Sequence, residues 1–140
     1  MKYFAFLEEE LKKEDHTMDE YTGARKVEEY RTHGERYKGP SFDTISSIGS
    51  NGAVIHYKPS KDDCKRLNND EIYLLDSGGQ YLDGTTDITR TGHFGGKEPT
   101  AFQKEAYTRV LMGNLDLERV VWPSAPKYTY AGKDFDYLAR

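Results

Sequence analysis

The stretch Leu74–Thr91 places two aspartates at the ends of consecutive strand-like runs. The apolar run Ile72–Leu75 leads directly into Asp76, and a second run brings Asp87 eleven positions later. A hairpin between the two runs would point both carboxylates at one spot. Carboxylate oxygens are hard ligands that suit divalent ions such as Mn²⁺, Mg²⁺ or Zn²⁺. The spacing therefore predicts half of a metal site at Asp76 and Asp87.

The register of that hairpin is left open by the sequence. Pairing Asp76 opposite Asp87 centres the turn on Tyr81-Leu82, whereas the strong turn dipeptide Asp83-Gly84 would place Asp76 opposite Thr91. A bulge in the glycine-rich segment could reconcile the two, and bulges gather near active sites. The spacing alone also fits two solvated turn acids without a ligand.

Residues 76–91 read Asp-Ser-Gly-Gly-Gln-Tyr-Leu-Asp-Gly-Thr-Thr-Asp-Ile-Thr-Arg-Thr. This segment resembles the metal-binding segment of the Xaa-Pro aminopeptidases, also called aminopeptidase P. Gly39–Pro59 and Lys104–Gly113 also resemble that family, so the likeness covers most of the chain. These enzymes are metallopeptidases with the pita-bread fold. The resemblance implies an α+β fold, the N-terminal half of a pita-bread (creatinase/aminopeptidase) fold with helices packed on an antiparallel sheet.

The resemblance also implies an activity, the release of an N-terminal residue from peptides with proline in second position. Two metal ions, usually Mn²⁺ with Zn²⁺ or Co²⁺ as alternatives, would hold a bridging hydroxide that attacks the scissile carbonyl. Asp76 would bind one metal and Asp87 would bridge both. The expected partners are peptides with a penultimate proline, and the intact protein could form a homodimer.

His56 is the candidate catalytic histidine. Ser50-Asn51-Gly52 predicts a hairpin turn between strands at Phe42–Ile48 and Ala53–Tyr57, which would place His56 on a strand. A histidine on an apolar strand is more often a hydrogen-bonded core residue. The resemblance of Ala-Val-Ile-His-Tyr implies instead a non-ligand active-site histidine that contacts substrate or shuttles protons. His93 matches no ligand position and is expected to be structural or exposed.

Two helices are predicted before the β region. The spacing of Phe4, Leu7 and Leu11 fits one face of a helix over residues 2–14. The sequence Thr17-Met18-Asp19-Glu20 fits a capping box for a second helix that ends near Gly34.

A third helix is predicted to begin at Pro99-Thr100, and Lys133–Arg140 is expected to begin a further one. The residues of the third helix that we expect to face inward are apolar: Phe102, Ala106, Val110, Leu111 and Leu115.

A chain of 140 residues has the length of a single domain. We expect a partial metallopeptidase catalytic domain over 1–140, with N-terminal helices in 1–38, a β region with the first metal ligands in 39–96, and a helix and the start of the second half in 97–140. In the family, the segment matching Asp136–Arg140 lies shortly before a His-rich segment with the next ligand, and two glutamate ligands follow later. We therefore expect the isolated chain to be inactive.

The net charge and the cysteine content exclude several classes of binding partner and metal site. The net charge of −4 gives no electrostatic case for nucleic acid or an acidic membrane, so neither is an expected partner. The single cysteine excludes an internal disulfide and a Cys-based zinc site. No apolar run approaches the roughly 18–20 residues of a membrane span, and the expected location is the cytoplasm.

Three alternatives stay open. A prolidase-like dipeptidase would share the fold and the metal ligands, although the sequence Asp-Gly-Thr-Thr-Asp disfavours it. A non-catalytic pita-bread binding module would lack the ligands, so the presence of Asp76 and Asp87 argues against it. The third is a fragment with no independent role.

Overall fold

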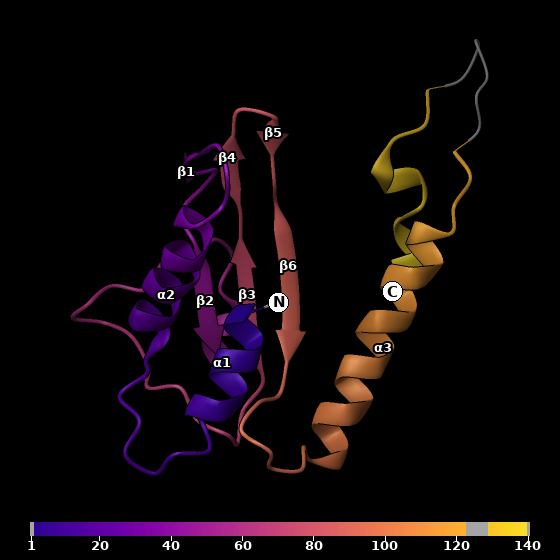
Figure 1. Ribbon diagram of the computed structural model, residues 1–140. Coiled ribbons are helices and arrows are strands. Elements are labelled where there is room, and N and C mark those ends of the chain that lie inside the picture. Colours follow the sequence, from indigo (N-terminus) through magenta and orange to yellow (C-terminus); the bar gives the residue numbers. More distant parts are fainter. Residues whose placement is uncertain (1, 123–128, 140) are drawn as a thin grey trace. The chain divides into compact units, whose positions relative to one another are not determined.

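A computed structural model of the chain describes residues 2–122 and 129–139 (Figure 1). The structure divides after Glu98 into two compact units. Among the described residues, none of the helices combines the length and the apolar character that crossing a membrane requires.

The first unit packs helices on antiparallel strands. One sheet has the order β1-β4-β5 and the other the order β2-β3-β6. Figure 1 shows α1 and α2 on one side of the β2-β3-β6 sheet. The elements are α1 (Lys2–Glu10), α2 (Glu20–Thr32), β1 (Tyr37–Pro40), β2 (Ile45–Ile48), the 3₁₀ helix η1 (Gly49–Ala53), β3 (Tyr73–Ser77), β4 (Gly79–Tyr81), β5 (Gly84–Thr85) and β6 (Ile88–Gly92).

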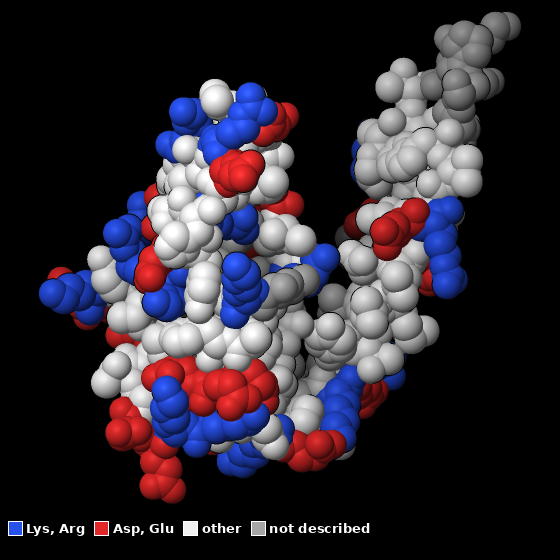
Figure 2. All heavy atoms as spheres, in the orientation of Figure 1, with Lys and Arg blue, Asp and Glu red and all other residues white. Residues whose placement is uncertain are grey.

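The core lies between the two helices and the β2-β3-β6 sheet. The helix predicted over residues 2–14 ends at Glu10, and Leu7 of α1 and Leu11 just after it are buried, where they pack with Val27 of α2 and Leu75 of β3. Charged side chains cover the outer helix surfaces in pairs such as Lys26–Glu29, and Figure 2 shows acidic and basic groups interspersed on the visible face. The apolar periodicity of the sequence therefore identifies the buried side of α1.

A chain of three hydroxyl groups crosses this core. The Tyr73 hydroxyl lies 2.9 Å from the Tyr3 hydroxyl and 2.8 Å from the Ser46 hydroxyl. A Cβ at Gly23 would lie 2.9 Å from the Tyr3 hydroxyl oxygen, so glycine leaves the space that the hydroxyl groups need. Burial raises the pKa of Tyr73 to about 12.

The predicted capping box of the second helix is wrong by two positions. The N-cap of α2 is Asp19, whose carboxylate accepts a hydrogen bond from Thr22 N at 2.6 Å, while Thr22 Oγ1 accepts from Asp19 N at 2.8 Å. The reason is a non-local pairing, because Leu67 N donates to the Met18 carbonyl at 3.0 Å and holds the chain extended up to Asp19. Glu20, which was expected to reach back as the box's acid, is fully buried.

The hairpin around the two aspartates has a register midway between the two that the sequence leaves open. Tyr81 pairs with Gly84, which centres the turn on Leu82-Asp83. Asp76 pairs with Thr89 in the β3–β6 ladder. The β4–β5 and β3–β6 pairs share one register, so this hairpin needs no bulge.

The second unit contains α3 (Ala101–Glu118) and two 3₁₀ turns, η2 (Gly132–Asp134) and η3 (Asp136–Ala139). The predicted start of α3 is confirmed, since Thr100 is the N-cap. The expectation that its apolar residues face inward is wrong in the described structure, where Phe102 is 78% and Val110 is 75% exposed. The helix expected from Lys133 is replaced by the two 3₁₀ turns.

Candidate metal centre

Asp76 lies near the end of β3, on the side of the strand that faces away from the helices. Burial alternates along β3, with Tyr73, Leu75 and Ser77 buried and the residues between them half-buried. Because successive strand side chains point to opposite faces, Asp76 lies on the face opposite the core.

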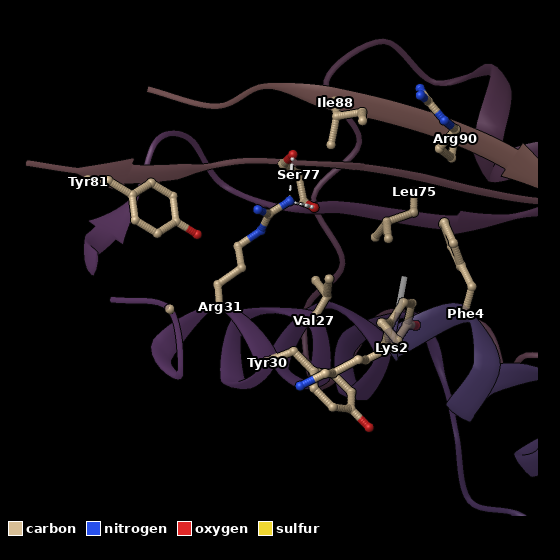
Figure 3. A pocket seen from close by; sticks show the side chains of 12 residues that line it. Lys2, Phe4, Val27, Tyr30, Arg31, Leu75, Ser77, Tyr81, Ile88 and Arg90 are labelled. Carbon is tan, nitrogen blue, oxygen red and sulfur yellow. Dashed lines mark hydrogen bonds between the residues drawn. The ribbon is translucent and has the colours of Figure 1, made fainter. Parts of the chain in front are cut away.

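Arg31 of α2 holds the strand end beside Asp76. Its Nη2 donates to the Ser77 carbonyl at 3.0 Å and to the Ser77 hydroxyl at 2.9 Å, as the dashed lines in Figure 3 show. These bonds fix the backbone directly after Asp76 from the helix side of the sheet.

The register brings Asp87 to the same face as Asp76. Asp76 pairs with Thr89, and Asp87 lies two residues before Thr89, just ahead of β6. Diagonal neighbours of this kind are typically about 7–8 Å apart. Asp87 is exposed, whereas Asp76 is half-buried. One ligand could therefore reach both carboxylates.

One oxygen of Asp76 is buried without a hydrogen-bond partner. This oxygen, Oδ1, is one of three such side-chain atoms in the described part of the chain. Buried polar atoms are nearly always hydrogen-bonded, and an exception points to a missing partner such as an ion or water. A divalent cation would supply that partner, so the donor atoms at Asp76 and Asp87 fit a hard metal ion. Within residues 2–122 and 129–139, no group of three or more His, Cys, Asp or Glu side chains is placed to hold one ion.

Gly78 fixes the backbone between the two aspartates. A Cβ at this position would overlap the carbonyl oxygen of Thr86 and the hydroxyl of Ser41. That hydroxyl donates to the Thr86 carbonyl at 2.8 Å, and Thr86 N donates to the Gly79 carbonyl at 2.9 Å. The strand with Asp76 and the segment leading to Asp87 are thus held in close contact through their backbones.

His56 does not lie on a strand. The predicted strand Ala53–Tyr57 is absent, because β2 pairs with β3 and the chain after it forms η1 and a turn. His56 is exposed in that turn with a φ of 56°. His93 is half-buried just after β6. Neither histidine is joined to Asp76 or Asp87 by any hydrogen bond or ion pair in the described structure.

A separate cavity of about 320 Å³ lies on the helix side of the sheet. Figure 3 shows Val27, Leu75 and Ile88 among its lining side chains, with Arg31 reaching across to Ser77. Because Leu75 and Asp76 point to opposite faces of β3, this cavity is not part of the candidate metal centre.

The model of metallopeptidase family M24 matches residues 2–139. The chain belongs to this family. The M24 chain is 57% identical over 125 residues to Xaa-Pro aminopeptidase 2 of Sus scrofa, an alignment that covers 89% of the chain and 18% of that relative. It is 53% identical over 139 residues to a Drosophila melanogaster Xaa-Pro aminopeptidase, with 99% of the chain and 22% of the relative covered.

A solved structure agrees with these sequence relatives. The M24 chain matches the Caenorhabditis elegans X-prolyl aminopeptidase, described as a cytosolic enzyme with a di-nuclear active site, with a TM-score of 0.85 and 34% identity. The match covers 99% of this chain and 22% of that one. The chain thus spans about a fifth of the length of these relatives. The predicted α+β fold, helices on antiparallel sheet as in the N-terminal part of the pita-bread aminopeptidase fold, is confirmed.

The sequence analysis missed the structural roles of three residues: Arg31 and Gly78 beside the candidate metal centre, and Glu20 beside the turn that carries His56. Arg31 and Glu20 act on segments 28 or more positions away, and only the folded chain shows those contacts. Gly78 carried a usable signal, because the Gly78-Gly79 pair at the end of a strand indicates close backbone approach.

Proposed function

We propose that this M24 chain contributes to the catalytic centre of an Xaa-Pro aminopeptidase, which releases the N-terminal residue of peptides whose second residue is proline. The sequence relatives with this activity in their names support the reaction type. The observation that carries the assignment to a site is the unpartnered, buried Oδ1 of Asp76, with Asp87 on the same face.

In this proposal the carboxylates of Asp76 and Asp87 would both hold the divalent metal. Mn²⁺ is the first choice, with Zn²⁺ and Co²⁺ as alternatives, because carboxylate oxygens favour hard or borderline ions. A bound divalent metal lowers the pKa of a water ligand enough to provide a hydroxide nucleophile near neutral pH. The chain's own contribution is the placement of the two carboxylates by the β3–β6 register and by the backbone contact at Gly78.

His56 contacts the substrate in this proposal. An imidazole can donate a proton or a hydrogen bond near neutral pH, where charge develops on the oxygen of an attacked carbonyl. The side chain of His56 is exposed and therefore open to a peptide.

The 140-residue chain by itself is proposed to lack turnover. Two carboxylates leave an ion mostly hydrated and weakly held, and the described residues offer no third protein ligand to the same ion. Incubation with Mn²⁺ and an Xaa-Pro peptide tests this point. Turnover that is abolished by Asp87→Ala would contradict it.

An NMR titration with Mn²⁺ tests the metal site directly. Paramagnetic broadening should begin at Asp76 and Asp87 and should be lost in Asp76→Asn. Asp62→Asn is the matched control, because Asp62 is an exposed acid in the loop after residue 59. Broadening centred on Asp62 and Asp63 would contradict the proposed site.

Location and assembly belong to the same proposal. The C. elegans neighbour is described as cytosolic, which supports the cytoplasm for this protein. A homodimer of the intact protein is proposed as well, and analytical ultracentrifugation of that protein tests it.

A further inference from the structure

The carboxylate of Glu20, the first residue of α2, is fully buried and accepts hydrogen bonds from four groups. Its Oε1 accepts from Ile48 N at 2.7 Å and from the Asn51 side-chain amide at 3.0 Å. Its Oε2 accepts from the Tyr57 hydroxyl at 2.6 Å and from Lys65 N at 2.8 Å. None of the ion pairs between described residues includes Glu20. Neutral side chains and backbone N–H groups thus satisfy this carboxylate.

All four donors belong to the segment Ile48–Lys65, which leaves β2 and carries His56. Asn51 lies in η1 before the histidine, and Tyr57 follows it directly. The Asn51 amide also donates to the Tyr57 hydroxyl at 3.0 Å. The two ends of the turn around His56 therefore meet at the carboxylate of Glu20.

Within the turn itself, Val54 N donates to the Asn51 carbonyl at 3.1 Å and Tyr57 N donates to the Val54 carbonyl at 3.2 Å, but its side chains add little support. Val54 is 53% and Ile55 is 86% exposed, so the tip gains little from packing. The side chain of His56 makes no hydrogen bond or ion pair within the described structure. Yet His56 has a φ of 56°, which lies in a region that residues other than glycine seldom adopt. Such conformations persist where the surroundings over-determine them, and here the restraint comes from the base of the turn.

The protonation of Tyr57 agrees with this arrangement. Burial raises the pKa of the Tyr57 hydroxyl, and the hydrogen bond to Glu20 raises it further. The hydroxyl therefore remains a donor to Glu20 through the neutral range. A carboxylate suits the position because its two oxygens offer about four acceptor sites and no donor.

We propose that Glu20 is a positioning residue, whose buried carboxylate fixes the turn that presents His56. The inference rests on the proposed function, in which His56 meets the peptide substrate. Glu20 itself touches neither substrate nor metal. Its role is to hold Asn51 and Tyr57 on either side of the histidine, so that the imidazole stays in one place.

The test is NMR of the isotope-labelled 140-residue chain, with two variants and one control. Tyr57→Phe removes one donor and leaves Glu20 with three. Glu20→Gln keeps the size of the side chain but turns an amide NH₂ toward donor groups. The control is Glu28→Gln, which changes a carboxylate of the same helix that accepts from the Thr44 hydroxyl at 3.2 Å.

Both variants should move the Cα and Cβ chemical shifts of His56 away from values typical of positive φ. The amides of residues 54 and 57 should exchange roughly three- to tenfold faster, the factor for losing one net hydrogen bond. Signals of the core residue Tyr73 should stay unchanged in Tyr57→Phe. Glu28→Gln should leave His56 as it is. A merely structural role would lower stability without a selective change at His56.

Unchanged His56 shifts and exchange rates in folded Tyr57→Phe and Glu20→Gln would overturn the proposal. If the Glu20→Gln variant does not fold, the His56 chemical shifts and exchange rates of the Tyr57→Phe variant alone test the proposal. A separate arm measures turnover of an Xaa-Pro peptide by the intact protein with Mn²⁺. Unchanged turnover in a His56→Ala variant of that protein contradicts the proposed function, whereas the NMR result from the Glu20 and Tyr57 variants still decides whether Glu20 positions the turn.

Discussion

Two carboxylates of this chain, Glu20 and Asp76, differ in how the fold satisfies them. Glu20 is fully buried and both of its oxygens accept hydrogen bonds from the chain. Asp76 is half-buried and its Oδ1 has no partner in the described structure. A buried acid with a complete set of internal donors supports the fold, while an acid with an unpaired buried oxygen is available to a ligand. The number of donors that the chain supplies separates the two roles.

The largest expected effect comes from removing the satisfied carboxylate. Glu20→Leu should lower the free energy of unfolding by about 2–5 kcal/mol, because Ile48 N and Lys65 N would lose their acceptor in a buried site. The measurement is the urea midpoint at constant m-value, with Glu28→Gln as control. A loss below about 1 kcal/mol would fall in the ordinary range for a point substitution and break the contrast between Glu20 and Asp76.

A smaller effect on stability is expected in the hairpin that carries Asp76. There, close backbone contact rather than a side chain restrains the strands. Gly78→Ala should destabilise the chain by about 1–3 kcal/mol, the usual penalty for inserting a methyl into filled space, since its Cβ would overlap the Thr86 carbonyl and the Ser41 hydroxyl. Gly52→Ala is the matched control, because its nearest neighbours would lie 3.8 and 3.9 Å away. Equal melting temperatures for the two variants would show that the contact at Gly78 does not hold the hairpin.

Alkaline pH should act on the Glu20 side through its donor Tyr57. The folded state raises the pKa of Tyr57, and raises that of Tyr73 to about 12, above the ordinary tyrosine value of 10. The stability from both groups is therefore fully present below pH 10 and is lost as the pH rises above 10. Unfolding measured from pH 9 to 12 should show this fall. In Tyr57→Phe, the total loss of unfolding free energy over this pH range should be smaller by about 1 kcal/mol, the net value of one hydrogen bond. The same loss in Tyr57→Phe as in the unchanged chain would exclude Tyr57 as a contributor.

Features set by neighbouring residues could be predicted from the sequence. Leu7 and Leu11 lie one helical turn apart and are buried together, and Thr100 caps α3 as expected from its place before an amphipathic run. The α+β fold and the candidate pair Asp76 and Asp87 came from a local string and its family resemblance.

Features set by distant parts of the chain could not be predicted. The start of α2 is displaced because Met18 pairs with Leu67, far along the sequence. The expected strand at residues 53–57 does not form, since β2 takes β3 as its partner and Glu20 binds the segment that follows. The apolar face of α3 has the period of a buried helix, yet Phe102 is exposed. Periodicity shows which face is apolar, but not whether a partner for it lies in the same unit.

The smallest effect on stability, and the sharpest test of the contrast, is expected for Asp76→Asn. Because none of the described residues donates to Oδ1, the substitution should change the free energy of unfolding by no more than about 0.5 kcal/mol. The gain in stability that Mn²⁺ gives the unchanged chain by binding only the folded state should disappear in this variant. Thermal unfolding with and without Mn²⁺ measures both quantities. A loss of more than about 1 kcal/mol without metal would mean that the Asp76 carboxylate already supports the fold, as that of Glu20 does, and the two acids would no longer differ in kind.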